Sequence, residues 1–185
     1  MKTKKAALPL LLCALLWAGT SLFSYGKPTA GLPAAVEQAA QEDFKSFLDK
    51  FTTSAAFQYS RIKFPLETPI TLLTDDGDEK TFPFTKERWP LLNAESFVVE
   101  QAVQEEEGSV YIARYVIDQP DHKEYEAGYE ESEPDLRVVF KRTGGKWYVT
   151  DCYNAWYSFS LLVEEFADTV KEVQEENKAF VEEYP

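Results

Sequence analysis

The chain has 185 residues, of which 44% are hydrophobic, and its 32 Asp and Glu residues against 19 Lys and Arg residues give a formal net charge of −13 at pH 7. A surface this acidic repels the phosphates of nucleic acids and the headgroups of anionic lipids, which excludes nucleic-acid binding. A single His and two Cys exclude histidine-rich metal sites and multi-cysteine zinc sites, so neither a metal nor a cofactor is expected.

Residues 1–26 are predicted to form a secretory signal peptide. They combine a basic start, an apolar stretch over 6–17 and a series of small residues at the end. The apolar stretch is shorter than a membrane-spanning helix requires. We expect cleavage after Gly26, with Ser24 at the third position before the cut. Cleavage after Ser21 and an uncleaved anchor are the alternatives.

Cys13 raises the alternative of a lipid anchor, because lipoproteins carry a cysteine after a small residue. Here the bulky Leu12 precedes it, so Cys13 is interpreted as part of the apolar core of the signal. The mature chain, residues 27–185, is therefore predicted to be exported to the periplasm or outside the cell, without an integral membrane segment. It retains only Cys152, so an intramolecular disulfide cannot form.

The first half of the mature chain is predicted to be mostly helical. After a loose leader at 27–33, apolar residues spaced three and four apart predict a helix over 34–51. This apolar face consists of Val36, Ala40, Phe44, Phe47, Leu48 and Phe51. The elements expected next are a short helix at 55–59, an extended segment at 61–66, a hairpin with arms at 68–74 and 80–83, and one helical turn at 86–92.

The second half is predicted to be mostly strand. The expected strands are 97–104, 110–118, 136–142 and 147–157, followed by a long helix at 160–183 with a strongly acidic outer face. The turn spacings, including Gly144-Gly145, favour an antiparallel meander. The fold class is therefore α+β, with N-terminal helices packed on a curved, cone-like antiparallel sheet, plus a long C-terminal helix, all in one domain.

Residues 118–135 are predicted to be an acidic loop between two of these strands. Oxygen clusters of this kind can hold calcium, but the spacing does not match the EF-hand pattern. The composition favours a solvated loop, and calcium stays open as the alternative. His122 could act as a general base in this loop, although a lone surface histidine is the simpler interpretation.

The order of elements, with a meander ending in VVFKRTGGKWYVTDC (138–152), resembles the nuclear transport factor 2-like superfamily of cystatin-like fold. In that superfamily a hairpin often enters its last strand through Gly-x-Trp, which is Gly145-Lys146-Trp147 here. The resemblance implies a cone-shaped sheet. The superfamily contains isomerase- and cyclase-like enzymes as well as non-catalytic binding modules. The long C-terminal helix departs from its usual ending at a strand.

A second stretch, DFKSFLDKFTTSAAFQYSRIKFPL (43–66), is similar to an uncharacterised family of secreted Bacteroidales proteins, which we identify with domain of unknown function 4348. This resemblance implies the same fold and an exported location. It implies no activity, so no functional residue is carried over from it.

The strand at 147–157 supplies a candidate pocket. Under strict alternation, Asp151 shares a face with Trp147 and Tyr153. A carboxylate among aromatic side chains on a concave sheet could have a raised pKa and act as a general acid or base. Tyr111 or Tyr115 could then donate a hydrogen bond to a developing oxyanion.

The alternative is a structural role for the same residues. Aromatic cross-strand pairs would stabilise the sheet, and Asp151 would bond to backbone or to Arg114. Cys152 lacks a nearby activating base in the sequence and is interpreted as a small buried hydrophobe. Arg61 is expected to form an internal ion pair with an acid of the first helix.

Three functional hypotheses remain open. The first is an exported, non-catalytic module that binds a small molecule or a protein. The second is a small-molecule enzyme of isomerase or cyclase type that uses Asp151 and a tyrosine. The third is an interaction module that docks through its acidic C-terminal helix. An Asp151 that lines a cavity would favour the enzyme, whereas an Asp151 bound to an arginine would remove it.

Overall fold

The computed structural model describes residues 41–98, 103–104 and 110–184. All of them belong to one compact unit, Gln38–Pro185. The predicted signal peptide, the leader and the first part of the predicted helix at 34–51 lie outside the described residues.

Two short helices open the described chain. Helix α1, Phe44–Phe51, begins at Asp43, whose side chain accepts a hydrogen bond from the backbone N–H of Ser46 at 2.8 Å. Helix α2, Ala55–Ser60, is capped in the same way by Ser54. The predicted apolar face is confirmed where it is described, because Phe47 and Phe51 are completely buried.

A hairpin and a five-stranded sheet make up the β structure. The hairpin pairs β1 (Ile70–Leu73) with β2 (Glu79–Phe82), close to the predicted arms. In the larger sheet each strand pairs antiparallel with the next along the chain, so the predicted antiparallel meander is confirmed, with one strand more than expected. Its strands are β3 (Val103–Gln104), β4 (Val110–Asp118), β5 (His122–Tyr129), β6 (Leu136–Thr143) and β7 (Lys146–Asn154).

Strand β5 corrects the prediction of an acidic loop over 118–135. Its buried residues Tyr125 and Ala127 alternate with Glu124 and Glu126, which is the period of a half-buried strand. The high density of acids hid this alternation in the sequence. Because successive carboxylates of a strand point to opposite faces or stand well apart, they do not form the converging oxygen set that calcium requires.

Strand β7 contains a bulge that the sequence did not reveal. Val139 of β6 pairs with Asp151 and Phe140 pairs with Val149, so Thr150 is an extra residue without a partner. Before the bulge, Val149 faces the core; after it, Cys152 faces the core. Asp151 therefore points to the opposite face of the sheet, and the prediction that it shares a face with Trp147 is wrong.

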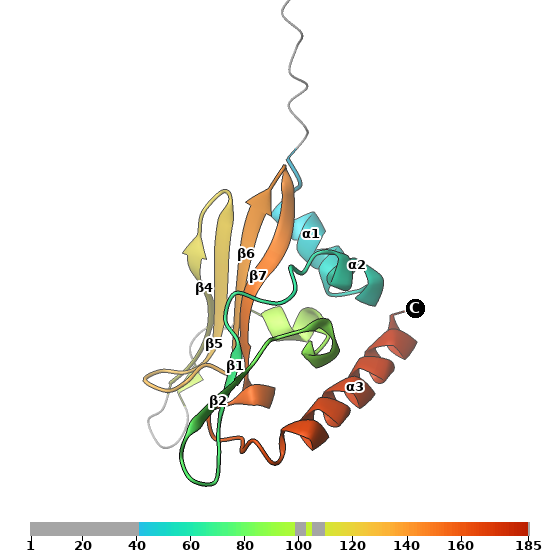
Figure 1. Ribbon diagram of the computed structural model, residues 1–185. Coiled ribbons are helices and arrows are strands. Elements are labelled where there is room, and N and C mark those ends of the chain that lie inside the picture. The colour runs from blue at the N-terminus through green and yellow to red at the C-terminus, as the bar shows by residue number, and fades with distance from the viewer. Residues whose placement is uncertain (1–40, 99–102, 105–109, 185) are drawn as a thin grey trace, which may run out of the picture. The chain divides into compact units, whose positions relative to one another are not determined.

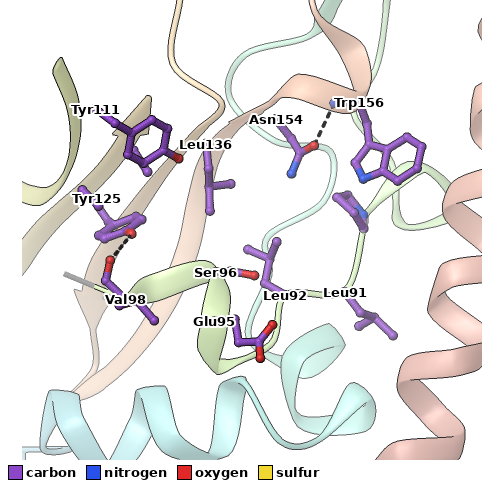
Figure 2. A pocket seen from close by; sticks show the side chains of 13 residues that line it. Leu91, Leu92, Glu95, Ser96, Val98, Tyr111, Tyr125, Leu136, Asn154 and Trp156 are labelled. Carbon is purple, nitrogen blue, oxygen red and sulfur yellow. Dashed lines mark hydrogen bonds between the residues drawn. The ribbon is translucent and has the colours of Figure 1, made fainter. Parts of the chain in front are cut away.

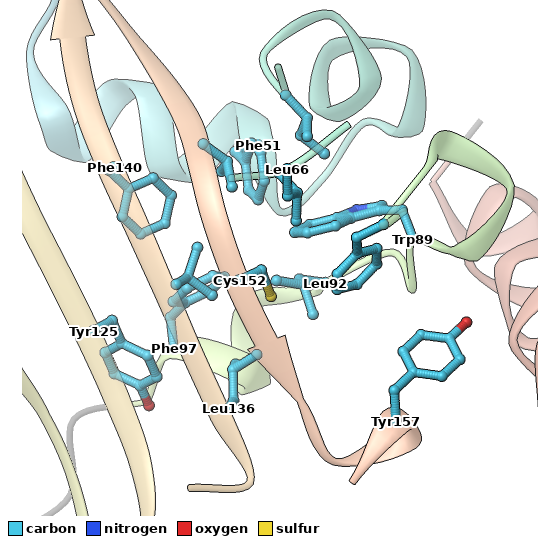
Figure 3. Close-up of a cluster of buried hydrophobic side chains, with 14 of the residues drawn as sticks. Phe51, Leu66, Trp89, Leu92, Phe97, Tyr125, Leu136, Phe140, Cys152 and Tyr157 are labelled. Carbon is cyan, nitrogen blue, oxygen red and sulfur yellow. The ribbon is translucent and has the colours of Figure 1, made fainter. Parts of the chain in front are cut away.

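The helices lie on one face of the sheet, and the core fills the space between them (Figures 1 and 3). Phe44 packs on Trp147 with 5.0 Å between ring centroids and on Phe140 with 5.3 Å. The first helix and the strand after Gly144-Gly145 thus share one interior. The segment 61–67 covers the outer edge of β7, where Val149 donates to the carbonyl of Arg61 at 2.8 Å.

Short 3-10 helices lie where the sequence predicted a longer helical turn, the start of one strand and the end of another. These are η1 (Lys86–Arg88), η2 (Ala94–Phe97) and η3 (Ala155–Tyr157). The strand predicted over 97–104 is reduced to β3 among the described residues. The strand predicted to reach residue 157 ends at Asn154. The Asn154 side chain accepts a hydrogen bond from Trp156 N at 3.0 Å, and the chain turns there.

The C-terminal helix α3, Phe166–Glu183, begins six residues later than predicted, because turns occupy the preceding segment. It lies on the same side as α1 and α2 and contacts η1 and η3 (Figure 1). Phe166, Val173 and Phe180 form its buried stripe. Asn177 fixes the helix by accepting from Leu91 N at 2.7 Å and donating to Trp89 O at 2.8 Å.

Candidate functional site

A cavity of about 600 Å³ lies between η2 and the ends of strands β4 to β7 (Figure 2). Tyr111 and Tyr125 stand on one side of it, and Trp156 stands on the other. The interior is aliphatic, with Leu92 and Leu136 both buried. A cavity of this size with aromatic and aliphatic walls has the dimensions and character of small-molecule sites.

Neighbouring strands hold the two tyrosines in place. Tyr125 is almost completely buried in β5, and its hydroxyl donates to the carbonyl of Val98 at 3.1 Å. Tyr111 in β4 packs edge-on against Tyr129, with 5.2 Å between ring centroids. These contacts set the position of both rings, so this wall of the cavity is preorganised.

The opposite wall is more open to solvent. Trp156 follows the end of β7 and remains 37% exposed although it is a large apolar side chain. The Asn154 oxygen is already used by Trp156 N, and its amide nitrogen stays available to the cavity (Figure 2). An exposed indole beside a polar amide is suited to contacting a bound molecule.

Helix η2 supplies the polar end of the cavity. Asn93 accepts hydrogen bonds from both the backbone N–H and the hydroxyl of Ser96, at 3.2 Å each, and so orders the turn. Glu95 is exposed at the mouth. No Lys, Arg or His is among the described residues that line the cavity. The only formal charge on its described wall is therefore negative.

Asp151 lies elsewhere, on the outer face of the sheet. Its carboxylate accepts hydrogen bonds from the backbone N–H of Thr68 at 3.0 Å and from the Thr68 hydroxyl at 2.9 Å, and it pairs with Arg137 at 3.2 Å. Arg137 also binds Glu124 at 2.6 Å. Burial lowers the pKa of Arg137, but these two carboxylates outweigh it and leave the pKa above its ordinary value.

The remaining predicted pocket residues are dispersed. Trp147 is buried in the core, and Arg114 is exposed on β4. Tyr115 packs between Phe44 and Tyr125, and burial raises its pKa to about 12. Tyr153 lies two residues after Asp151 on β7, and burial and a neighbouring carboxylate, Glu133, raise its pKa. Of the predicted set, Tyr111 alone lines the cavity.

Sequence reasoning missed Tyr125, Glu95 and Trp156 as site residues. Tyr125 lay in the segment predicted as a loop, and Trp156 lay in a segment predicted as strand. The available signal was the alternation of Tyr125 and Ala127 with acidic residues, which indicates a strand with one buried apolar face. No comparable signal identified Glu95.

The described residues offer neither a metal-binding cluster nor a membrane-spanning helix. In the described part of the chain, no group of three or more His, Cys, Asp or Glu side chains could hold a metal ion. Across the same residues, none of the helices combines the length and the apolar character needed to cross a membrane. Cys152 is buried in the core, and burial raises the pKa of its thiol, which disfavours the reactive thiolate.

A second, shallower groove of about 560 Å³ lies between α3 and η1. Tyr59, Leu91 and Val181 contribute its apolar surface, and Lys86 stands 4.5 Å from the centroid of the Tyr59 ring. This groove carries lysines as well as acids, which separates it chemically from the cavity beside η2.

Comparison with known proteins places the chain in a family. A family model described only as "-like:-like" matches residues 42–181. A crystal structure of a cystatin-like protein from Bacteroides caccae ATCC 43185 is 59% identical, with a TM-score of 0.74, and the match covers 80% of this chain and 98% of that one. The chain belongs to this cystatin-like family.

Two solution structures are similar to the same extent. A protein from Bacteroides uniformis ATCC 8492 is 61% identical, with a TM-score of 0.72, over 80% of this chain and 99% of that one. A protein from Bacteroides ovatus ATCC 8483 is 59% identical, with a TM-score of 0.73, over 78% and 94%. No curated protein matches significantly. These matches name neither the nuclear transport factor 2-like superfamily nor domain of unknown function 4348, so both stay predictions.

Proposed function

We propose that this cystatin-like protein is an exported, non-catalytic module that binds a small amphipathic molecule in the cavity beside η2. The observation that carries the proposal is the cavity itself, about 600 Å³ with Tyr111, Tyr125 and Trp156 in its walls. The almost completely buried Tyr125 and the aliphatic side chains give it a preformed apolar interior, and Asn154 and Ser96 offer polar groups.

The geometry supports binding over the isomerase or cyclase alternative. That alternative required Asp151 to line a cavity, but Asp151 is paired with Arg137 and bonded to Thr68 on the outer face. Among the described lining residues, the one carboxylate is Glu95, which stands at the exposed mouth. A solvated carboxylate is a poor general base compared with one in an apolar site.

Export remains part of the proposal because the basic and apolar start of the chain has the form of a signal peptide. The nuclear transport factor 2-like assignment also belongs here, supported by the order of helices followed by a meander. A ligand outside the cytoplasm would reach the cavity through the open side at Trp156.

The test is a titration followed by nuclear magnetic resonance on the chain from residue 27 onward. Two neutral probes, 2-phenylethanol and cyclohexanol, are added at millimolar concentration. We expect shifts of the Trp156 indole N–H and the Leu136 methyl groups, because both side chains line the cavity. Trp156→Ala should weaken binding about fivefold or more, since truncating an aromatic anchor costs about 1 kcal/mol or more.

The matched control is Phe159→Ala, which removes an aromatic side chain that is 60% exposed and does not line the cavity. It should leave both titrations unchanged. Shifts confined to Tyr59 and Val181 would move the site to the groove on α3, and an absence of shifts with either probe at the cavity would contradict the proposed function.

A further inference from the structure

From the charges around the cavity we propose that its ligand is a cation, an amine or guanidinium attached to an apolar body, with the charge held at Glu95 and the body against the aromatic walls. This inference rests on the proposed function and adds the ligand's chemical class.

The first argument is the charge of the wall. Glu95 is the one charged side chain among the described lining residues, and it forms no ion pair with any Lys, Arg or His of the described chain. An anionic ligand would meet an unpaired like charge at the mouth, whereas a cationic ligand would complete a pair. The surrounding field has the same sign, because the chain carries a formal net charge of −13.

The positive charges of the sheet lie away from the described wall of the cavity. The arginines of the sheet do not form an ion pair with Glu95. Arg137 is engaged by Glu124 and Asp151 on the opposite face, and Arg114 extends from the same face as Arg137.

The third argument is the nature of the walls. Indole and phenol rings offer large, rigid apolar surfaces against which the body of an amphipathic cation can pack. Tyr111, Tyr125 and Trp156 all line this one space (Figure 2). Leu92 and Leu136 extend the surface deeper with purely aliphatic contact. The cavity therefore has one carboxylate at its mouth and an apolar surface behind it.

The experiment compares three probes with the same body and different charge: phenethylamine, 2-phenylethanol and phenylacetate. Binding is followed through the Trp156 indole and Leu136 methyl resonances. We expect phenethylamine to bind roughly two- to fivefold tighter than the alcohol, the range of a solvent-exposed ion pair, and phenylacetate to bind more weakly than either. The preference should shrink as sodium chloride is added, because salt screens exposed charges.

Two variants test whether Glu95 causes the preference for the amine over the alcohol. Glu95→Gln keeps the shape of the mouth and should bring the amine and the alcohol to nearly equal affinity. Glu172→Gln, at an exposed position on α3, removes the same charge away from the cavity and should preserve the preference.

The outcomes separate the two proposals. If the alcohol binds in the cavity and the amine binds no tighter, the ligand class is wrong while the proposed function stands. A preference that survives in Glu95→Gln also overturns the inference. If none of the three probes perturbs the cavity, the proposed function fails and the inference fails with it.

Discussion

Gln58 on α2 connects the end of α1 and the segment 89–92 through one buried side chain. It is completely buried, and its amide nitrogen donates to the carbonyls of Phe51 at 2.7 Å and Leu92 at 3.0 Å. Its amide oxygen accepts from the Trp89 indole at 2.7 Å and from Leu92 N at 2.9 Å. Every polar group of this amide is satisfied, which is the condition for burying one without a large penalty.

Replacing Gln58 with Leu should destabilise the protein by roughly 3 kcal/mol, because several buried donors and acceptors lose their partner at once. Urea denaturation measures the change in the free energy of unfolding. Gln174→Leu is the matched control at an exposed position of α3, where a change within about 0.5 kcal/mol is expected. Equal effects at the two positions would show that the Gln58 network does not stabilise the fold.

At the scale of elements, an ion pair joins the start of α1 to the sheet. Arg61 donates through both terminal nitrogens to Glu42, at 2.8 and 2.9 Å, and also to the carbonyl of Trp147 at 3.1 Å. Glu42 in turn accepts from Trp147 N at 2.8 Å. The predicted partner of Arg61 was an acid of the first helix. The observed partner, Glu42, lies directly before Asp43, which is the N-cap of α1.

This pair makes stability depend on acidic pH. Burial raises the pKa of Glu42, but the hydrogen bonds from Arg61 and Trp147 and the nearby positive charges outweigh it and lower the pKa below 4.5. Because the folded-state pKa is depressed, the contribution is present above about pH 4.5 and is lost as the pH falls through the folded-state pKa.

Glu42→Gln should therefore destabilise the protein at pH 6.5 by about 1 kcal/mol, a value that allows for partial solvent screening. The difference from the unmodified protein should shrink as the pH is lowered from 4.5 toward 3. Chemical denaturation at several pH values measures it, with the exposed Glu175→Gln as control. A difference that stays constant with pH would contradict this account.

At the scale of the whole molecule, the described residues share one hydrophobic interior. It runs from Phe44 beside Trp147 to Phe166 on α3, and Cys152 lies within it (Figure 3). Burial raises the pKa of the Cys152 thiol, so both access and ionisation oppose its reaction. The thiol therefore reports on opening of the interior as a unit.

A chain beginning at Lys27 contains Cys152 as its one cysteine. Its reaction with a thiol reagent such as DTNB at pH 8 should be far slower in the native protein than in guanidinium chloride. A Ser160→Cys variant, which adds a thiol at an exposed position, should gain one rapidly reacting equivalent. Fast labelling of Cys152 in the native state would show that the interior opens locally.

Much of the fold could be predicted because it depends on patterns among residues that are close in the sequence. The spacing of Phe44, Phe47 and Phe51 allows one buried helical face, and Gly144-Gly145, both at positive φ, permit the tight turn between β6 and β7. The candidate site was much less predictable. Only Tyr111 of the predicted pocket lines the cavity. Asp151 and Tyr153 do not, because strand alternation was extended across Thr150 as though the bulge were absent.

The sequence by itself determined the compositional limits, the class of fold and most strands of the antiparallel sheet, because each depends on charge or on periodicity within a few neighbouring residues. The tertiary structure alone decided which face Asp151 occupies, that Arg137 and Thr68 are its partners, and that η2 brings Glu95 to the same space as Trp156. Those outcomes depend on register between strands and on contacts between distant segments, where a shift of one residue reverses every side chain beyond it.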